Sequence, residues 1–169
     1  MFKLGIIGAG WIADKMAATL AHAEDYCIHA IASRSFEKAE AFAQKWGISK
    51  AYGSYEDLVK DENIDLVYVA TPHSHHYEHA LLAIRNNKPV LVEKAFTANA
   101  QEAEQLINEA RSRNVFIAEA IWTRYMPLSK KVNEIMDNGI IGIPRILTAT
   151  LCYSMEQKKR IVVPELCGG

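Results

Sequence analysis

The stretch FKLGIIGAGWIA at residues 2–13 decides the fold. Its first part, residues 2–7, is mostly apolar and predicts a short buried strand, and apolar residues then recur at helical spacing from Trp11 to about His22. The turn between strand and helix has the spacing G-x-G-x-x-G/A, which is typical of turns that bind dinucleotides. The stretch therefore predicts the opening unit of a dinucleotide-binding domain.

Small residues give this turn its expected chemistry. Gly8 permits a tight turn, Gly10 lacks the Cβ that would collide with a pyrophosphate, and Ala13 lets the helix pack closely against the strand. The free N–H groups of the first helical turn would face the phosphates, and the helix dipole favours negative charge there. We therefore predict that Gly8, Gly10, Trp11 and Ile12 bind the cofactor.

Strands and helices alternate after this unit. Further strands are predicted at residues 27–32, 50–52, 64–70, 89–93 and 115–119. Helices are predicted at residues 35–46, from residue 54, and at residues 75–86 and 98–113. Ser35 and Ser54 are suited to cap the first two of these helices, and Gly47 to end the first. Because parallel strands need such crossover connections, we predict an α/β fold with a doubly wound parallel sheet, the Rossmann arrangement.

The alternation of buried strands and helices stops after residue 119. Pro127 can start a helix that ends near Gly139, and residues 145–153 alternate as in an antiparallel strand with one open face. We therefore expect residues 1–121 to form the dinucleotide-binding domain and residues 122–169 to be the incomplete start of a second, α+β domain. The lone strand would carry an unpaired edge.

Composition and charge exclude several classes of function. With 50% hydrophobic and 23% charged residues among 169, the chain is neither a disordered tail nor a disulfide scaffold. Its 19 basic and 20 acidic residues give a net charge of -1, which argues against a nucleic acid or an anionic membrane as partner. No apolar run approaches the ~18 residues of a membrane span. A small molecule is the expected partner.

The three cysteines, Cys27, Cys152 and Cys167, are too few and too scattered for a disulfide framework or a metal knuckle. We expect them to be buried residues without a chemical role. This usage of cysteine suggests a reducing compartment, so we expect a cytoplasmic protein.

The end of the second predicted strand indicates which cofactor is preferred. Where NAD is preferred, an acidic residue follows the glycine turn by about twenty residues, but this chain has Ser33-Arg34-Ser35 at that point. The Arg34 guanidinium can bind a 2'-phosphate with two hydrogen bonds, and Lys38 can assist one helical turn further on. The pattern favours NADP, with NAD possible, while stacking of Arg34 on adenine or simple solvation remains an alternative.

Ligands of open parallel sheets lie at the carboxyl ends of the strands, so the residues that follow the later strands are candidates for the site. They come from the segments at residues 71–76, 93–95 and 120–125. We predict that the cofactor contacts of these segments are Thr71, Pro72, His73, His76, Glu93, Lys94, Trp122 and Arg124.

Four histidines, at positions 73, 75, 76 and 79, fall within seven residues. A zinc site is conceivable, but no cysteine or acid accompanies them at the spacing of metal ligands, and we predict that no metal binds. The indole rings of Trp11 and Trp46 are expected to pack against the protein rather than to recognise a ligand.

Four stretches resemble the glucose-fructose oxidoreductase, inositol dehydrogenase and MocA family. They are GIIGAGWIA at residues 5–13, TPHSHH at 71–76, VLVEKAF at 90–96 and PELCGG at 164–169. EAIWTRYMP at residues 119–127 is most similar to the dihydrodiol dehydrogenase-like branch, whose members use NADP. The resemblance implies hydride transfer between a nicotinamide and a hydroxyl or carbonyl group of a sugar, polyol or cyclic diol.

The resemblance also implies roles for single residues. It puts Lys94 beside the nicotinamide and the reacting oxygen, where an ammonium can donate to the carbonyl oxygen as negative charge develops. Ala95 replaces the usual proline and leaves the turn after the lysine less restrained. His73 replaces an asparagine, His76 matches a histidine near the cofactor ribose, and Arg124 would meet substrate or support the junction of the domains.

In that family the substrate sheet, the proton donor and the surface for homo-oligomer formation follow the glycine-rich segment, beyond residue 169. We therefore expect this chain to bind the nucleotide but to turn over poorly by itself. A non-catalytic or regulatory nucleotide-binding module is the alternative. Lys94 favours the enzyme, because binding alone needs no ammonium beside the nicotinamide.

Overall fold

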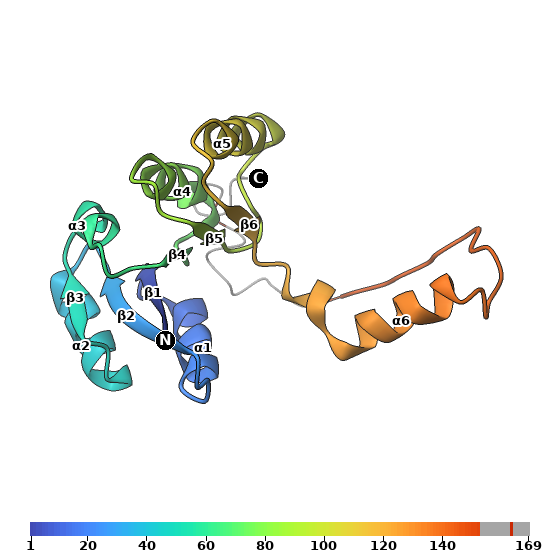
Figure 1. The fold of residues 1–169 in the computed structure, drawn as a ribbon, viewed down its shortest axis with the longest axis horizontal. Coiled ribbons are helices and arrows are strands. Elements are labelled where there is room, and N and C mark those ends of the chain that lie inside the picture. Colours follow the sequence, from blue (N-terminus) through green and yellow to red (C-terminus); the bar gives the residue numbers. More distant parts are fainter. Residues whose placement is uncertain (153–162, 164–169) are drawn as a thin grey trace.

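The computed structural model describes residues 1–152 and residue 163. Within these residues, six parallel strands form one sheet in the order β3-β2-β1-β4-β5-β6 (Figure 1). The strands are β1 (Phe2–Ile7), β2 (Tyr26–Ala32), β3 (Lys50–Tyr52), β4 (Leu66–Val69), β5 (Val90–Val92) and β6 (Ile117–Glu119). This order reverses direction at β1, and such a reversal is where doubly wound sheets bind ligands.

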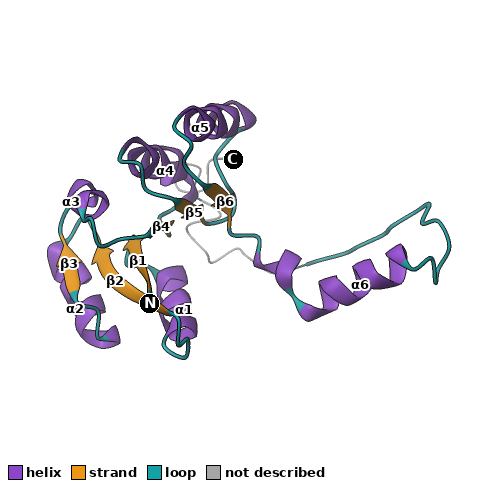
Figure 2. Ribbon diagram, viewed as in Figure 1, coloured by secondary structure: helices purple, strands orange, loops and turns teal. Residues whose placement is uncertain are grey.

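Helices connect the strands, as Figure 2 shows. They are α1 (Trp11–Leu20), α2 (Phe36–Trp46), α3 (Tyr55–Lys60), α4 (His76–Arg85), α5 (Ala100–Ser112) and α6 (Pro127–Asp137), with the short 3-10 turns η1 (His73–His75) and η2 (Trp122–Tyr125). The predicted caps are confirmed: Ser35 Oγ accepts from the Lys38 N–H (3.3 Å), and Ser54 Oγ accepts from the Asp57 N–H (3.2 Å). Gly47 ends α2 in the left-handed conformation (φ 65°).

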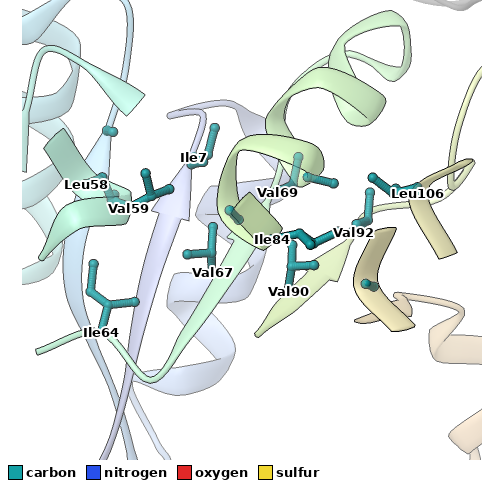
Figure 3. Packing of buried hydrophobic residues seen from close by; sticks show 14 of the residues in the cluster. Ile7, Leu58, Val59, Ile64, Val67, Val69, Ile84, Val90, Val92 and Leu106 are labelled. Atoms are coloured by element: carbon teal, nitrogen blue, oxygen red, sulfur yellow. The ribbon is translucent and has the colours of Figure 1, made fainter. Parts of the chain in front are cut away.

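Apolar side chains cover both faces of the sheet. One face packs against α3, α4 and α5, where Val69 and Val92 of the strands meet Ile84 and Leu106 of the helices (Figure 3). The other face packs against α1 and α2, through residues such as Ile6, Ala13, Ile31, Phe42 and Tyr68. Strands buried on both faces are the reason why the sequence shows continuous apolar runs rather than alternation. The predicted α/β Rossmann fold is confirmed.

Main-chain hydrogen bonds align the carboxyl ends of the central strands. The Ala70 N–H donates to the Ile7 carbonyl oxygen (2.8 Å), and the Glu93 N–H donates to the Val69 carbonyl oxygen (3.0 Å). The Ala120 N–H then donates to Val92 across the next pair of strands (2.8 Å). The segments that follow β1, β4, β5 and β6 therefore start at one edge of the sheet.

The predicted strand at residues 145–153 is wrong over residues 145–152, which have no regular structure. Apolar side chains such as Ile146 and Leu147 are each 87% exposed. Alternation describes the two faces of a strand, but a strand also needs a hydrogen-bonded neighbour, and the described part of the chain offers none here. Tyr153 and the PELCGG stretch lie outside the described residues.

Two expectations about single side chains also fail. Trp46 packs against the core, but the Trp11 ring is 67% exposed at the start of α1, so the prediction that both rings pack is wrong for Trp11. Cys27 is half-buried and Cys152 is exposed, so the cysteines are not uniformly buried, and Cys167 lies outside the described residues. Across residues 1–152 and residue 163, the helices are too short or too polar to cross a membrane.

Candidate functional site

The glycine turn follows β1, and its two glycines are needed for different reasons. Gly8 has φ +102°, and a Cβ at this position would lie 2.9 Å from the Ala70 carbonyl oxygen. Gly8 is therefore required by the protein's own packing. A Cβ at Gly10 would approach no closer than 4.0 Å to its nearest neighbour, again the Ala70 oxygen. Packing does not require a glycine at position 10, so the space beside it is available to a ligand.

The first turn of α1 borders that space. No side chain caps the N-terminus of this 10-residue helix, so its first N–H groups are free to bind an anion. Gly10, Trp11 and Ile12 line a cavity of about 180 Å³ together with the segment after β4, residues 70–73. Ala13 is fully buried beneath them, as the predicted close helix packing requires. An open cradle, free N–H groups and the positive end of a helix fit a pyrophosphate.

Two basic side chains follow β2 and border different hollows. Arg34 is exposed and borders a hollow of about 340 Å³ with Tyr55, Glu56 and His79. Lys38 is also exposed and borders a second groove, of about 390 Å³, which includes Gly10 and Trp11. Ser33, between β2 and Arg34, accepts a hydrogen bond from the Ser35 N–H through its Oγ (3.4 Å).

Sequence reasoning missed part of the Arg34 hollow. Glu56 lies 22 positions after Arg34 and brings a carboxylate to the same hollow, with its Oε2 accepting from the Ser54 hydroxyl (3.0 Å). Burial raises the pKa of the Tyr55 hydroxyl, while the nearby Arg34 guanidinium acts in the opposite direction. The ring of Tyr55 meets the His79 ring edge-on, with centroids 4.6 Å apart.

The histidines that follow β4 differ in burial and in hydrogen-bond partners. His79 is largely buried, its Nδ1 lies 3.0 Å from the Thr71 hydroxyl, and burial lowers its pKa to about 4. His75 is paired with Glu78 on the surface (2.7 Å). His76 has no exposed surface, and both of its ring nitrogens lie on main-chain carbonyl oxygens. Within residues 1–152 and residue 163, these rings and the acids near them form no group that could hold a metal ion.

The segment after β5 carries Lys94 to the cofactor cavity. Lys94 is exposed and lines a small cavity of about 60 Å³ with Trp11, Thr71, His76 and Glu93, among others. In the described part of the chain, no carboxylate lies within 4.0 Å of its ammonium. Its main-chain N–H, by contrast, donates to Glu93 Oε2 (3.2 Å). The side chain of Lys94 is therefore available to a ligand.

Trp122 and Arg124 do not border the cavities that the other predicted residues line. Both belong to η2, after β6, and both are exposed. Neither borders the cavities described above, which are lined by the segments after β1, β2, β4 and β5. The structure thus brings Gly10, Trp11, Ile12 and the segments after β4 and β5 together, and leaves η2 apart. A cofactor contact by Trp122 or Arg124 stays a prediction.

Comparisons with known proteins also indicate a site that binds a nicotinamide dinucleotide. Residues 2–120 match the profile of an oxidoreductase family with an NAD-binding Rossmann fold, GFO_IDH_MocA. The chain is 38% identical over 169 residues to a trans-1,2-dihydrobenzene-1,2-diol dehydrogenase of Mus musculus, covering 99% of this chain and 51% of that protein. It is 40% identical over 189 residues to a D-xylose 1-dehydrogenase (NADP(+)) of Hypocrea jecorina, covering 99% of this chain and 48% of that protein.

Solved structures agree with these sequence matches. A crystal structure of KijD10, a 3-ketoreductase from Actinomadura kijaniata in complex with NADP, superposes with a TM-score of 0.76 at 31% identity. The superposition covers 83% of this chain and 45% of KijD10. The chain spans about half the length of the curated relatives that it matches.

Proposed function

Because this chain belongs to the glucose-fructose oxidoreductase, inositol dehydrogenase and MocA family of NAD-binding oxidoreductases, we propose that it holds the cofactor of a dehydrogenase. Hydride passes between the nicotinamide and a hydroxyl or carbonyl group of a sugar, polyol or cyclic diol. One observation carries this proposal: the Lys94 ammonium, with no carboxylate partner among the described residues, lines a cavity together with the first residues of α1.

The chain's own residues fit a dinucleotide. Gly10 and the N–H groups at the start of α1 would hold the pyrophosphate, because a helix N-terminus without a side-chain cap attracts an anion. Trp11, Thr71 and Pro72 would line the path from the pyrophosphate toward Lys94. When bound, the nicotinamide supplies or accepts the hydride.

Lys94 would act on the oxygen of the reacting group. Its ammonium donates a hydrogen bond to the carbonyl oxygen, and this bond strengthens as negative charge develops there. An ammonium that already had a carboxylate partner would be less able to do this. The exposed position of Lys94 leaves the substrate a route to it.

Two basic residues support NADP as the preferred cofactor. Arg34 offers a planar set of donors that suits a 2'-phosphate, and Lys38 lies in the groove that reaches Gly10. The xylose dehydrogenase relative is named for NADP(+), and KijD10 was crystallised with NADP. The Glu56 carboxylate in the Arg34 hollow repels a phosphate. We propose that the attraction between Arg34 and the 2'-phosphate is stronger than this repulsion.

Three further proposals concern the whole protein. Among the described residues, the last strand of the sheet ends at Glu119 and the side chains of α6 are exposed or half-buried, which supports a domain boundary near residue 122. A homo-oligomer and a cytoplasmic location are proposed from the family resemblance and from the sparse cysteines, of which Cys27 and Cys152 are free thiols. The substrate is proposed to be a small molecule, as in the diol and xylose dehydrogenases.

An activity assay tests the proposed function. The longest natural form of the protein is incubated with NADP⁺ and a panel of sugars, polyols and dihydrodiols, and with NADPH and the matching carbonyl compounds. We expect turnover with at least one pair. Lys94→Met should abolish turnover while leaving NADPH affinity nearly unchanged. Tight cofactor binding with no turnover on any substrate would favour a regulatory module instead.

A further inference from the structure

Tyr68 and Glu93 form a buried pair directly behind Lys94. Tyr68 lies in β4 and is 1% exposed, and its hydroxyl donates to Glu93 Oε1 at 2.5 Å. The other carboxylate oxygen of Glu93, Oε2, accepts the main-chain N–H of Lys94 (3.2 Å). Both oxygens therefore accept hydrogen bonds, as an ionised carboxylate does. A buried charge is tolerated only when it is bonded in this way, so the pair fixes the rotamer of Glu93.

His76 holds the chain on the other side of Lys94. This residue begins α4, and its side chain has no exposed surface. Its Nδ1 lies 2.7 Å from the Ala95 carbonyl oxygen, and its Nε2 lies 2.9 Å from the Thr71 carbonyl oxygen. The ring thus joins the segment after β4 to the residue that follows Lys94.

The His76 ring lines the same small cavity as Glu93 and Lys94. The His73 ring lies against it, with ring centroids 5.4 Å apart. The tautomer of His76 decides which ring nitrogen donates to a carbonyl oxygen.

We propose that Tyr68 and His76 are positioning residues for Lys94: Tyr68 acts through the Glu93 carboxylate, and His76 acts through the Ala95 carbonyl. The Lys94 N–H then donates to a carboxylate that Tyr68 of β4 holds in place, and the carbonyl oxygen of the next residue, Ala95, contacts His76 of α4. This inference rests on the proposed function of Lys94, but it concerns contacts that exist without cofactor. Neither residue touches the substrate in this arrangement.

The experiment compares conservative variants with matched controls. Tyr68→Phe removes only the hydroxyl, and Tyr77→Phe is its control because the Tyr77 hydroxyl binds Gln105 on the surface (2.9 Å). His76→Gln leaves a single donor group, and His75→Gln is its control because His75 pairs with Glu78 on the surface. Lysines are dimethylated with ¹³C, and the Lys94 resonance is assigned with Lys94→Arg.

We expect Tyr68→Phe and His76→Gln to shift the Lys94 resonance of the folded protein, while both controls leave it unchanged. Loss of stability alone would lower the melting temperature without moving the Lys94 resonance. An unchanged Lys94 resonance in folded Tyr68→Phe and His76→Gln overturns the proposal. Failure of the wild-type chain to bind NADPH would instead count against the proposed function, whatever the resonance does.

Discussion

The main chain of Gly8 packs directly against the Ala70 carbonyl oxygen, so closely that a Cβ at position 8 would lie 2.9 Å from that oxygen. The turn after β1 and the end of β4 are therefore in contact without any side chain between them. Gly8 also has φ +102°, a conformation that L residues rarely adopt.

Gly8→Ala should destabilise the fold. Strain at a positive φ costs about 1–3 kcal/mol, and the clash with the end of β4 adds to it. Urea denaturation of the wild type and the variant measures the difference in free energy of unfolding. Equal stability of the two proteins would mean that the turn is looser than the contact between Gly8 and Ala70 indicates.

Arg34→Ala should change the choice of cofactor. Hydrogen bonds to a charged group contribute about 1.5–3 kcal/mol, and the exposure of Arg34 puts the effect near the lower end, so NADPH affinity should fall about tenfold. NADH affinity, measured by the same fluorescence titration, should stay the same, because NADH has no 2'-phosphate. An equal loss for both nucleotides would show that Arg34 contacts adenine or supports the fold.

Asp61→Asn should weaken the sheet and flatten its response to acid. Burial alone would raise the pKa of Asp61, but hydrogen bonds from the Lys50 ammonium (2.8 Å), from Asn63 and from the Tyr52 hydroxyl (2.9 Å) hold it well below its usual range. His29 Nε2 lies 3.2 Å from the same carboxylate without hydrogen-bond geometry. The native state therefore binds this proton less readily than the unfolded chain does.

The sign of the pH effect follows from that difference. Stability contributed by Asp61 is fully present above the ordinary carboxyl pKa of about 3.9 and is lost as pH falls toward the folded value. At pH 7 the variant should lose about 1–3 kcal/mol, and denaturation curves of the two proteins should converge as pH falls below 4. A constant difference across this range would contradict the low pKa of Asp61.

His79 should titrate in the acid range. Burial lowers its pKa to about 4, so between pH 6.5 and 4 the unfolded chain takes up a proton that the native state does not. Stability should therefore fall as pH decreases through this interval, and less so in His79→Asn. NMR titration of the ring measures the midpoint directly. A midpoint near 6.5 would mean that the ring is more solvated than its contacts with Thr71 and Tyr55 indicate.

The glycine turn and the helix caps could be predicted from sequence because the residues that specify each of them are neighbours along the chain. Gly8 and Gly10 show the turn by their spacing, and the caps at Ser35 and Ser54 depend on residues three positions away. The alternation at residues 145–152 led to a wrong strand prediction because it too is only a local signal. A side-chain pattern says which faces a strand would have, but not whether a partner strand is present.

Contacts between distant parts of the chain could not be predicted in this way. Tyr68 and Glu93 lie 25 positions apart, and only the pairing of β4 with β5 brings them together. His76 was recognised by its motif, but its burial between two carbonyl oxygens depends on the packing of α4. Glu56 of α3 and His79 of α4 come to border the same hollow as Arg34 only when the chain is folded.

The titration of the purified chain with NADPH, in parallel with Gly10→Ala, tests the central claim most directly. We predict saturable fluorescence energy transfer from tryptophan for the wild type. For Gly10→Ala we predict about tenfold weaker binding or worse, with stability reduced by less than about 1 kcal/mol, because the added methyl group enters the ligand's space rather than the protein's. No binding by the wild type at millimolar NADPH or NADH, or unchanged binding by Gly10→Ala, would contradict it.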